Sequence, residues 1–79
     1  MTDKLYQLVA KVLGIEPDTI TDNSTPESIP SWTSFKGYVL LYELETNYNV
    51  KFTIDEAMDV KSVKDIKRHL KNHGVIFNE

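Results

Sequence analysis

The sequence predicts an all-α domain, a bundle of three longer helices and one short one. Apolar residues recur at three- and four-residue spacing in three separate segments. Serine, threonine or glycine stands where these segments begin or end, as is typical of helix caps. A length of 79 residues allows one small core, so we expect a single domain, residues 1–79.

The first helix is predicted between residue 2 and Gly14. Thr2 is a suitable N-cap, and Asp3 places negative charge in the first turn, where the helix dipole favours it. Gly14 stands where a left-handed C-cap is expected. The apolar positions between them form one stripe: Leu5, Leu8, Val9 and Val12.

Residues 15–33 are predicted to form a long connection without regular structure. Pro17, Pro26 and Pro30 interrupt any helical period. Connections of this length are uncommon in compact domains and are often functional. Its length would allow the second helix to be something other than an antiparallel neighbour of the first. We expect three isoleucines to attach it to the core: Ile15, Ile20 and Ile29.

The second helix is predicted from about Ser34 to Tyr48 and is apolar on nearly every side. At 100° per residue, an inner arc contains Leu40, Leu41, Leu44 and Tyr48. An outer arc contains Phe35, Tyr38, Val39 and Tyr42. Such a helix is central in a bundle or meets a partner, and here we expect both. In the alternative interpretation, the two outer tyrosines cover the core beneath the long connection.

Two further helices are predicted. Thr53 and Glu56 have the spacing of a capping box and open a short helix. Ser62 opens the last helix, and Gly74 supplies its end. The core-facing stripe of this last helix contains Val63, Ile66 and Leu70.

Composition excludes several classes of protein. The absence of cysteine excludes disulfides and thiolate metal sites. No stretch has the apolar length of a membrane span and no signal-peptide pattern is present, so we expect a cytoplasmic protein. The net charge of −3 argues against a nucleic-acid partner. We interpret the basic residues near the C-terminus as one solvated helix face: Lys61, Lys64, Lys67, Arg68 and Lys71.

Few residues have the spacing that catalysis or metal binding requires. His69 and His73 could share a metal ion, but no third ligand lies near them in sequence, so we favour packing or solvent exposure. We expect no enzyme. Ser34 allows two interpretations: Ser34, Thr33 or Ser31 caps the second helix, or Ser34 is a modification site. At a helix start, free N–H groups stabilise an attached anion.

Several short motifs occur in a characteristic order. The run Trp32-Thr33-Ser34-Phe35 opens the second helix, and Leu44-Glu45, Tyr48, Phe52, Thr53 to Glu56 and Val63-Lys64-Asp65-Ile66 follow it. Upstream, Val12-Leu13-Gly14-Ile15 and Ile20-Thr21 extend the pattern. In this order and spacing, the sequence resembles the acyl and peptidyl carrier proteins. The second helix of that family typically opens with Asp-Ser-Leu, in some members after a tryptophan.

The resemblance implies a four-helix bundle whose serine, here Ser34, receives 4′-phosphopantetheine from coenzyme A through a phosphopantetheinyl transferase. The thiol of this arm then carries an acyl or aminoacyl group as a thioester, which a partner ligase or synthase loads. The carrier supplies a tether, partner recognition and often a protective groove. We expect a monomer that binds neither nucleic acid nor membrane.

The chain departs from the family pattern around this serine. Thr33 replaces the usual aspartate, which puts recognition by a generic transferase in question, and Phe35 replaces leucine. The acidic second helix of fatty-acid-type carriers is largely missing, which indicates a specialised or secondary-metabolite pathway. We expect partners to meet an aromatic face with little electrostatic steering. Its residues are Thr33, Phe35, Lys36, Tyr38, Val39, Tyr42 and Glu45.

Two alternatives remain open at this point: a carrier-like interaction module that is not modified, and a small regulatory helical domain in which Ser34 is only a cap. Gly37 lies on the inner arc, where glycine costs about 1 kcal/mol relative to alanine. It either allows close helix packing or leaves room for the arm.

Overall fold

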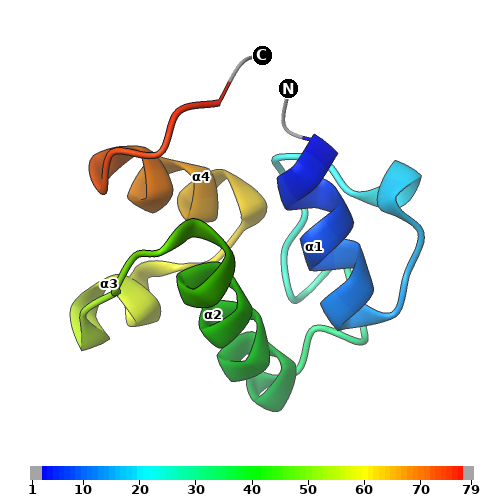
Figure 1. Cartoon of the computed structure of the whole chain (residues 1–79). Coiled ribbons are helices and arrows are strands. Elements are labelled where there is room, and N and C mark those ends of the chain that lie inside the picture. The colour runs from blue at the N-terminus through cyan, green and yellow to red at the C-terminus, as the bar shows by residue number, and fades with distance from the viewer. Residues whose placement is uncertain (1–2, 78–79) are drawn as a thin grey trace.

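The computed structural model describes residues 3–77, and within this range the chain is all-helical without strands (Figure 1). The predicted all-α class is therefore confirmed. Thr2, the expected cap of the first helix, lies outside the described residues. The elements are α1 Asp3–Leu13, the 3-10 helix η1 Pro17–Thr19, α2 Ser34–Tyr48, α3 Ile54–Asp59 and α4 Val63–Asn72.

The three longer helices end in the same way, with a left-handed residue that lets the chain turn back. Gly14 has a φ of 71° and Gly74 a φ of 93°, and Asn49 has a φ of 54°. The next N–H in each case bonds five residues back, as from Ile15 to the Ala10 carbonyl at 3.0 Å. The two glycines were predicted as helix ends, whereas the sequence analysis did not single out Asn49.

The caps of the last two helices also follow the sequence signals. Thr53 Oγ1 accepts from the Glu56 N–H at 3.1 Å, and the Glu56 carboxylate accepts from the Thr53 N–H at 2.8 Å. This is the predicted capping box. Ser62 Oγ accepts from the Asp65 N–H at 3.3 Å and caps α4.

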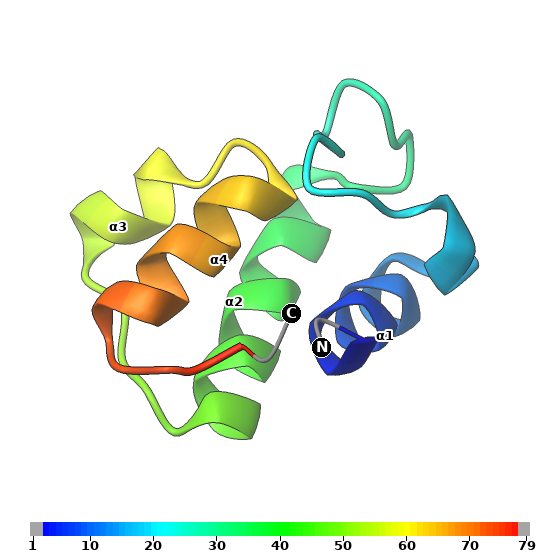
Figure 2. The same ribbon diagram turned by 90° about the horizontal axis from the view of Figure 1, so that it is seen from above.

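The core lies between α1, α2 and α4. The fully buried side chains are Leu5 and Val9 of α1, Leu40 and Leu44 of α2, and Val63, Ile66 and Leu70 of α4. Figures 1 and 2 show α1 and α2 as neighbours that run in broadly opposite directions. The long connection therefore does not separate them. By contrast, α3 contributes no buried residue and lies on the side of the bundle away from α1.

The long connection is attached to the core by its apolar residues, as predicted. Ile20 and Ile29 are buried, and Ile15 packs against the core. Its backbone also serves α4, because the Ser24 carbonyl accepts from the Val63 N–H at 3.1 Å and the Asp22 carbonyl from the Lys64 N–H at 2.8 Å. The connection thus satisfies two N–H groups that the first turn of a helix leaves without partners.

The Asp22 carboxylate joins the connection to two helices. It accepts from the Tyr6 hydroxyl of α1 at 2.5 Å and from Lys67 Nζ of α4 at 3.1 Å. The hydroxyl of Tyr6 and the ammonium of Lys67 together lower the pKa of Asp22, although partial burial opposes them. Lys67 is only 6% exposed, so its expected place on a solvated face is wrong. Sequence periodicity missed it because its partner lies 45 residues away.

Replacing this carboxylate is expected to destabilise the fold. Asp22→Asn removes the negative charge opposite the buried Lys67 ammonium. Breaking a fully buried ion pair costs about 3–5 kcal/mol, but the Asp22 side chain is 43% exposed. Solvent screening therefore reduces the expected loss to about 1–2 kcal/mol, measured as the change in the free energy of urea unfolding. Asp18→Asn, at an exposed site in η1, is the control. Equal stability of the two variants would contradict this assignment.

Candidate functional site

Ser34 is the first residue of α2, and its hydroxyl does not cap the helix. Thr33 is the N-cap: its backbone is extended, and its Oγ1 accepts from the Lys36 N–H at 3.2 Å. Of the three caps that the sequence allows, Ser34, Thr33 and Ser31, the structure selects Thr33, so the regulatory domain in which Ser34 is only a cap loses its premise. The Ser34 side chain is exposed, and within residues 3–77 it makes no hydrogen bond. Its hydroxyl is thus accessible to a modifying enzyme.

The start of α2 favours an anion. Its first turn contains no acidic side chain, whereas α3 begins with Asp55 and Glu56 and α4 has Asp65 at the same place. Thr33 caps the helix with a neutral hydroxyl, and Lys36 adds a positive charge within the first turn of α2. The positive end of the helix dipole is therefore not compensated by the protein's own carboxylates.

An apolar groove of about 300 Å³ opens beside Ser34. Trp32 lines it from the connection, Ser34, Gly37 and Leu41 from α2, and Ala57 and Met58 from α3. Most of this lining is apolar, so the groove suits an apolar group. A group attached to the Ser34 hydroxyl would start at the groove itself.

Gly37 does not serve close helix packing. A Cβ at this position would meet only Trp32 Nε1, at 3.7 Å, which is ordinary van der Waals contact. The suggestion that Gly37 brings two helices together is therefore wrong. The glycine instead keeps the space beside the Trp32 indole open.

The three aromatic residues of the outer arc of α2 are exposed to solvent. Phe35 is 72% exposed, Tyr38 73% and Tyr42 65%, so the interpretation in which the tyrosines cover the core is wrong. Two residues of α3 are similarly exposed, Ile54 by 79% and Met58 by 74%, and Met58 lines the groove together with Tyr38. We call these five residues the α2–α3 apolar face. Sequence analysis missed its α3 part, although an apolar pair four residues apart on a short helix is a visible signal.

The other candidate residues on α2 are less available. Lys36 and Val39 are half-buried. Glu45 accepts from the Phe52 N–H at 2.8 Å and so holds the segment between α2 and α3. Its carboxylate therefore has a structural partner within the chain.

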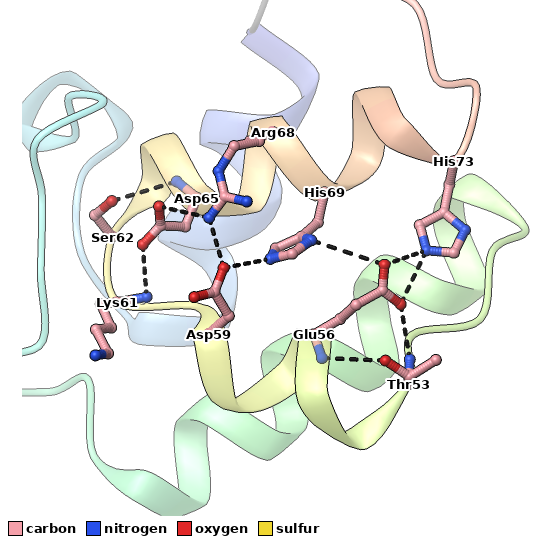
Figure 3. Close-up of polar contacts among 9 residues, drawn as sticks. All are labelled: Thr53, Glu56, Asp59, Lys61, Ser62, Asp65, Arg68, His69 and His73. Carbon is pink, nitrogen blue, oxygen red and sulfur yellow. Dashed lines mark hydrogen bonds and ion pairs between the residues drawn. The ribbon is translucent and has the colours of Figure 1, made fainter.

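One set of polar contacts attaches α3 to α4 through Asp59 (Figure 3). Asp59 Oδ2 lies 2.6 Å from Arg68 Nη2 and 2.9 Å from His69 Nε2. The hydrogen bond from Arg68 has the largest effect in lowering the pKa of Asp59, and the hydrogen bond with His69 lowers this pKa further. His69 is 7% exposed, so the structure shows a buried, paired histidine.

A second set of contacts involves Glu56. Its carboxylate lies 2.9 Å from His73 Nε2, and its nearer oxygen is 3.7 Å from His69 Nδ1 (Figure 3). The N–H of Thr53 and then His73 lower the pKa of Glu56. No three ligating side chains among residues 3–77 form a group suited to a metal ion. Because α3 supplies Ala57 and Met58, these contacts position one wall of the groove.

Comparison of the chain with protein-family models and with curated proteins finds no match. Within the part of the chain that the structure describes, no helix is both long and apolar enough to cross a membrane. Functional interpretation therefore rests on the geometry around Ser34.

Acidification is expected to release α3 before the rest of the bundle. Both carboxylates have lowered pKa values when folded, so their bonds stabilise α3 above the ordinary values of 4.5 for Glu56 and 3.8 for Asp59. This stabilisation is lost as the pH falls through the folded values. Amide hydrogen exchange at Ala57 and Met58, followed from about pH 5 to pH 3, should lose protection first, with Leu44 as the control. Simultaneous loss at α3 and α2 would contradict this expectation.

Proposed function

We propose that this chain is a carrier protein that holds an acyl or aminoacyl group as a thioester on a 4′-phosphopantetheine arm attached to Ser34. The observation that carries the proposal is the Ser34 hydroxyl, exposed at the first residue of α2, free of the capping role and beside an apolar groove. A structural serine at a helix start would be expected to cap it, and here Thr33 does so.

The charges at the start of α2 support a phosphodiester at this position. The arm would place a negative charge next to the first-turn N–H groups, where no acidic side chain competes with it. Lys36 lies in the same turn. Thr33, which stands where the carrier family usually has aspartate, caps the helix without placing a carboxylate close to the new phosphate.

The arrangement of the helices also supports a bundle of the acyl-carrier type. Three longer helices enclose the core, the third helix is short, and a long connection precedes α2. The groove between α2 and α3 adjoins the modified residue and can shelter part of an attached group. The chain itself would perform no chemical step, because the transferase and the loading enzyme form and break the bonds.

The α2–α3 apolar face is the proposed contact surface for these partner enzymes. Phe35, Tyr38 and Tyr42 stand on the helix that begins with Ser34. Exposed apolar clusters of this kind mark interaction sites in soluble domains. The same face favours the rival proposal, a carrier-like interaction module that is never phosphopantetheinylated.

Mass spectrometry distinguishes the two proposals. The purified protein is incubated with coenzyme A and a broad-specificity phosphopantetheinyl transferase, and its intact mass is recorded. We expect one phosphopantetheine adduct on the wild type and on Ser28→Ala, which lacks a different exposed serine, and none on Ser34→Ala.

The Thr33→Asp variant tests whether Thr33 restricts modification to a dedicated transferase. Aspartate is also a good N-cap, so this variant should keep the start of α2. An adduct on Thr33→Asp alone would retain Ser34 as the site. The carrier proposal is overturned if neither protein is modified and the chain isolated from its native host also lacks the arm.

Association with partner enzymes is expected to depend weakly on salt. Between about 50 and 500 mM salt, screening reduces electrostatic steering strongly but leaves apolar burial in place. The on-rate for the transferase, measured by surface plasmon resonance, should therefore change little. Tyr42→Ala should weaken binding by about 1–2 kcal/mol, and Glu27→Gln in the connection is the control. A steep fall of the on-rate with salt would show that the partner reads charge instead.

A further inference from the structure

Among the buried residues that line the groove, Trp32 alone has a side-chain hydrogen-bond donor, its indole N–H. Trp32 is 6% exposed and lines the groove. Within residues 3–77 its Nε1 donates no hydrogen bond, although buried tryptophans usually find an acceptor. Within the same residues, the buried side-chain nitrogen and oxygen atoms that lack a hydrogen-bond partner are Ser31 Oγ and His69 Nδ1, and Trp32 Nε1 is not one of them. Trp32 Nε1 therefore still reaches the molecular surface.

The approach to this N–H runs along the groove. Gly37 lines the groove too, and a Cβ at residue 37 would stand 3.7 Å from Trp32 Nε1. Alanine there would fit without a clash and would favour the helix more than glycine does. The glycine therefore gives up stability and leaves the space beside the donor clear.

The surroundings of the donor make it selective. The hydroxyls of Thr33, Ser34 and Tyr38 also border the groove but accept no hydrogen bond from the indole. The remaining side chains offer no acceptor, among them Leu40, Leu41, Met58, Val60 and Ile66. A hydrocarbon that covered the indole N–H would leave a buried polar group without a partner, which is unfavourable. A ligand with an oxygen acceptor at this point avoids that cost.

We infer that the groove binds an apolar group that carries a carbonyl oxygen, with Trp32 Nε1–H donating a hydrogen bond to that oxygen. A volume of about 300 Å³ is at the lower end for small-molecule sites, so the apolar body is a short chain or a single ring. That the bound group is the cargo or the arm of a carrier protein rests on the proposed function. That the groove binds an apolar carbonyl compound does not rest on it. The carbonyl can come from the cargo or from an amide of the arm.

The first experiment uses the unmodified protein and two probes. Trp32 is the single tryptophan of the chain, so a ¹⁵N-labelled sample gives one indole N–H signal. Acetophenone and ethylbenzene have the same ring and differ by a carbonyl in place of a methylene, so ring-current effects largely cancel. We expect acetophenone to move the indole proton downfield and ethylbenzene not to do so. Equal shifts with both probes, or no shift with acetophenone, would overturn the inference.

A donor-free variant adds an affinity measurement. Trp32→Phe keeps an aromatic ring but lacks the N–H. The affinity ratio of acetophenone to ethylbenzene, taken from the backbone amide shifts of Leu41 and Ala57, should fall about 2- to 10-fold, as expected for one net hydrogen bond. An unchanged ratio would overturn the inference. If this variant does not fold, the wild-type indole signal still decides.

Loaded forms distinguish the two sources of the carbonyl. Three forms are compared: the arm with a free thiol, the arm blocked as a hexyl thioether, and the arm carrying a hexanoyl thioester. A downfield indole shift in all three identifies an arm amide as the acceptor, and a shift in the hexanoyl form alone identifies the cargo. If no form shows the shift, the inference fails for a tethered group. Failure to attach any arm would refute the proposed function while leaving the acetophenone result intact.

Discussion

The rest of the structure depends on the hydrogen bonds and the ion pair that the Asp22 carboxylate forms. It bonds the Tyr6 hydroxyl of α1 and the Lys67 ammonium of α4, which are 16 and 45 residues away in sequence. The neighbouring carbonyls also take up the first N–H groups of α4. A connection as long as residues 14–33 loses much conformational entropy when it is ordered, and these contacts offset that loss at its middle. The far end of the connection then delivers Trp32 and Thr33 to the start of α2, so the geometry around Ser34 depends on this attachment.

The helix α3 is attached to the bundle by surface contacts instead of buried ones. It buries no residue, and it is held in place because Asp59 accepts a hydrogen bond from Arg68 of α4 and Glu56 pairs with His73 at the C-cap of α4. Partly exposed ion pairs contribute little to stability because water competes for them. Segments held in this way open at low cost in free energy. Since Met58 of α3 forms part of the groove wall, the most weakly attached helix borders the proposed binding space. Entry of a group into the groove therefore requires little disruption of the core.

The site combines features that serve different tasks within a few residues. Thr33 keeps the helix start intact, which frees the Ser34 hydroxyl for the proposed attachment of the arm. Trp32 packs against the core and lines the groove, while Phe35 is exposed to solvent. Core packing, capping and the proposed modification thus fall on three successive residues. The three side chains can point in different directions because the chain changes here from an extended segment to a helix.

Local sequence signals by themselves determined the helices, the N-caps of α3 and α4 and most of the core. The capping box at Thr53 and the glycine at residue 14 act within a few residues, so spacing alone predicts them. Only the tertiary structure decided that Lys67 is buried, that His69 pairs with Asp59, and that Trp32 and Met58 border one groove. It also assigned the cap to Thr33, because the backbone entering α2 decides which of two adjacent hydroxyls reaches the Lys36 N–H. Helical periodicity shows which face of a helix turns inward, but not which distant segment packs against that face. Contacts between segments far apart in the chain depend on how the helices pack, and no local pattern contains that information.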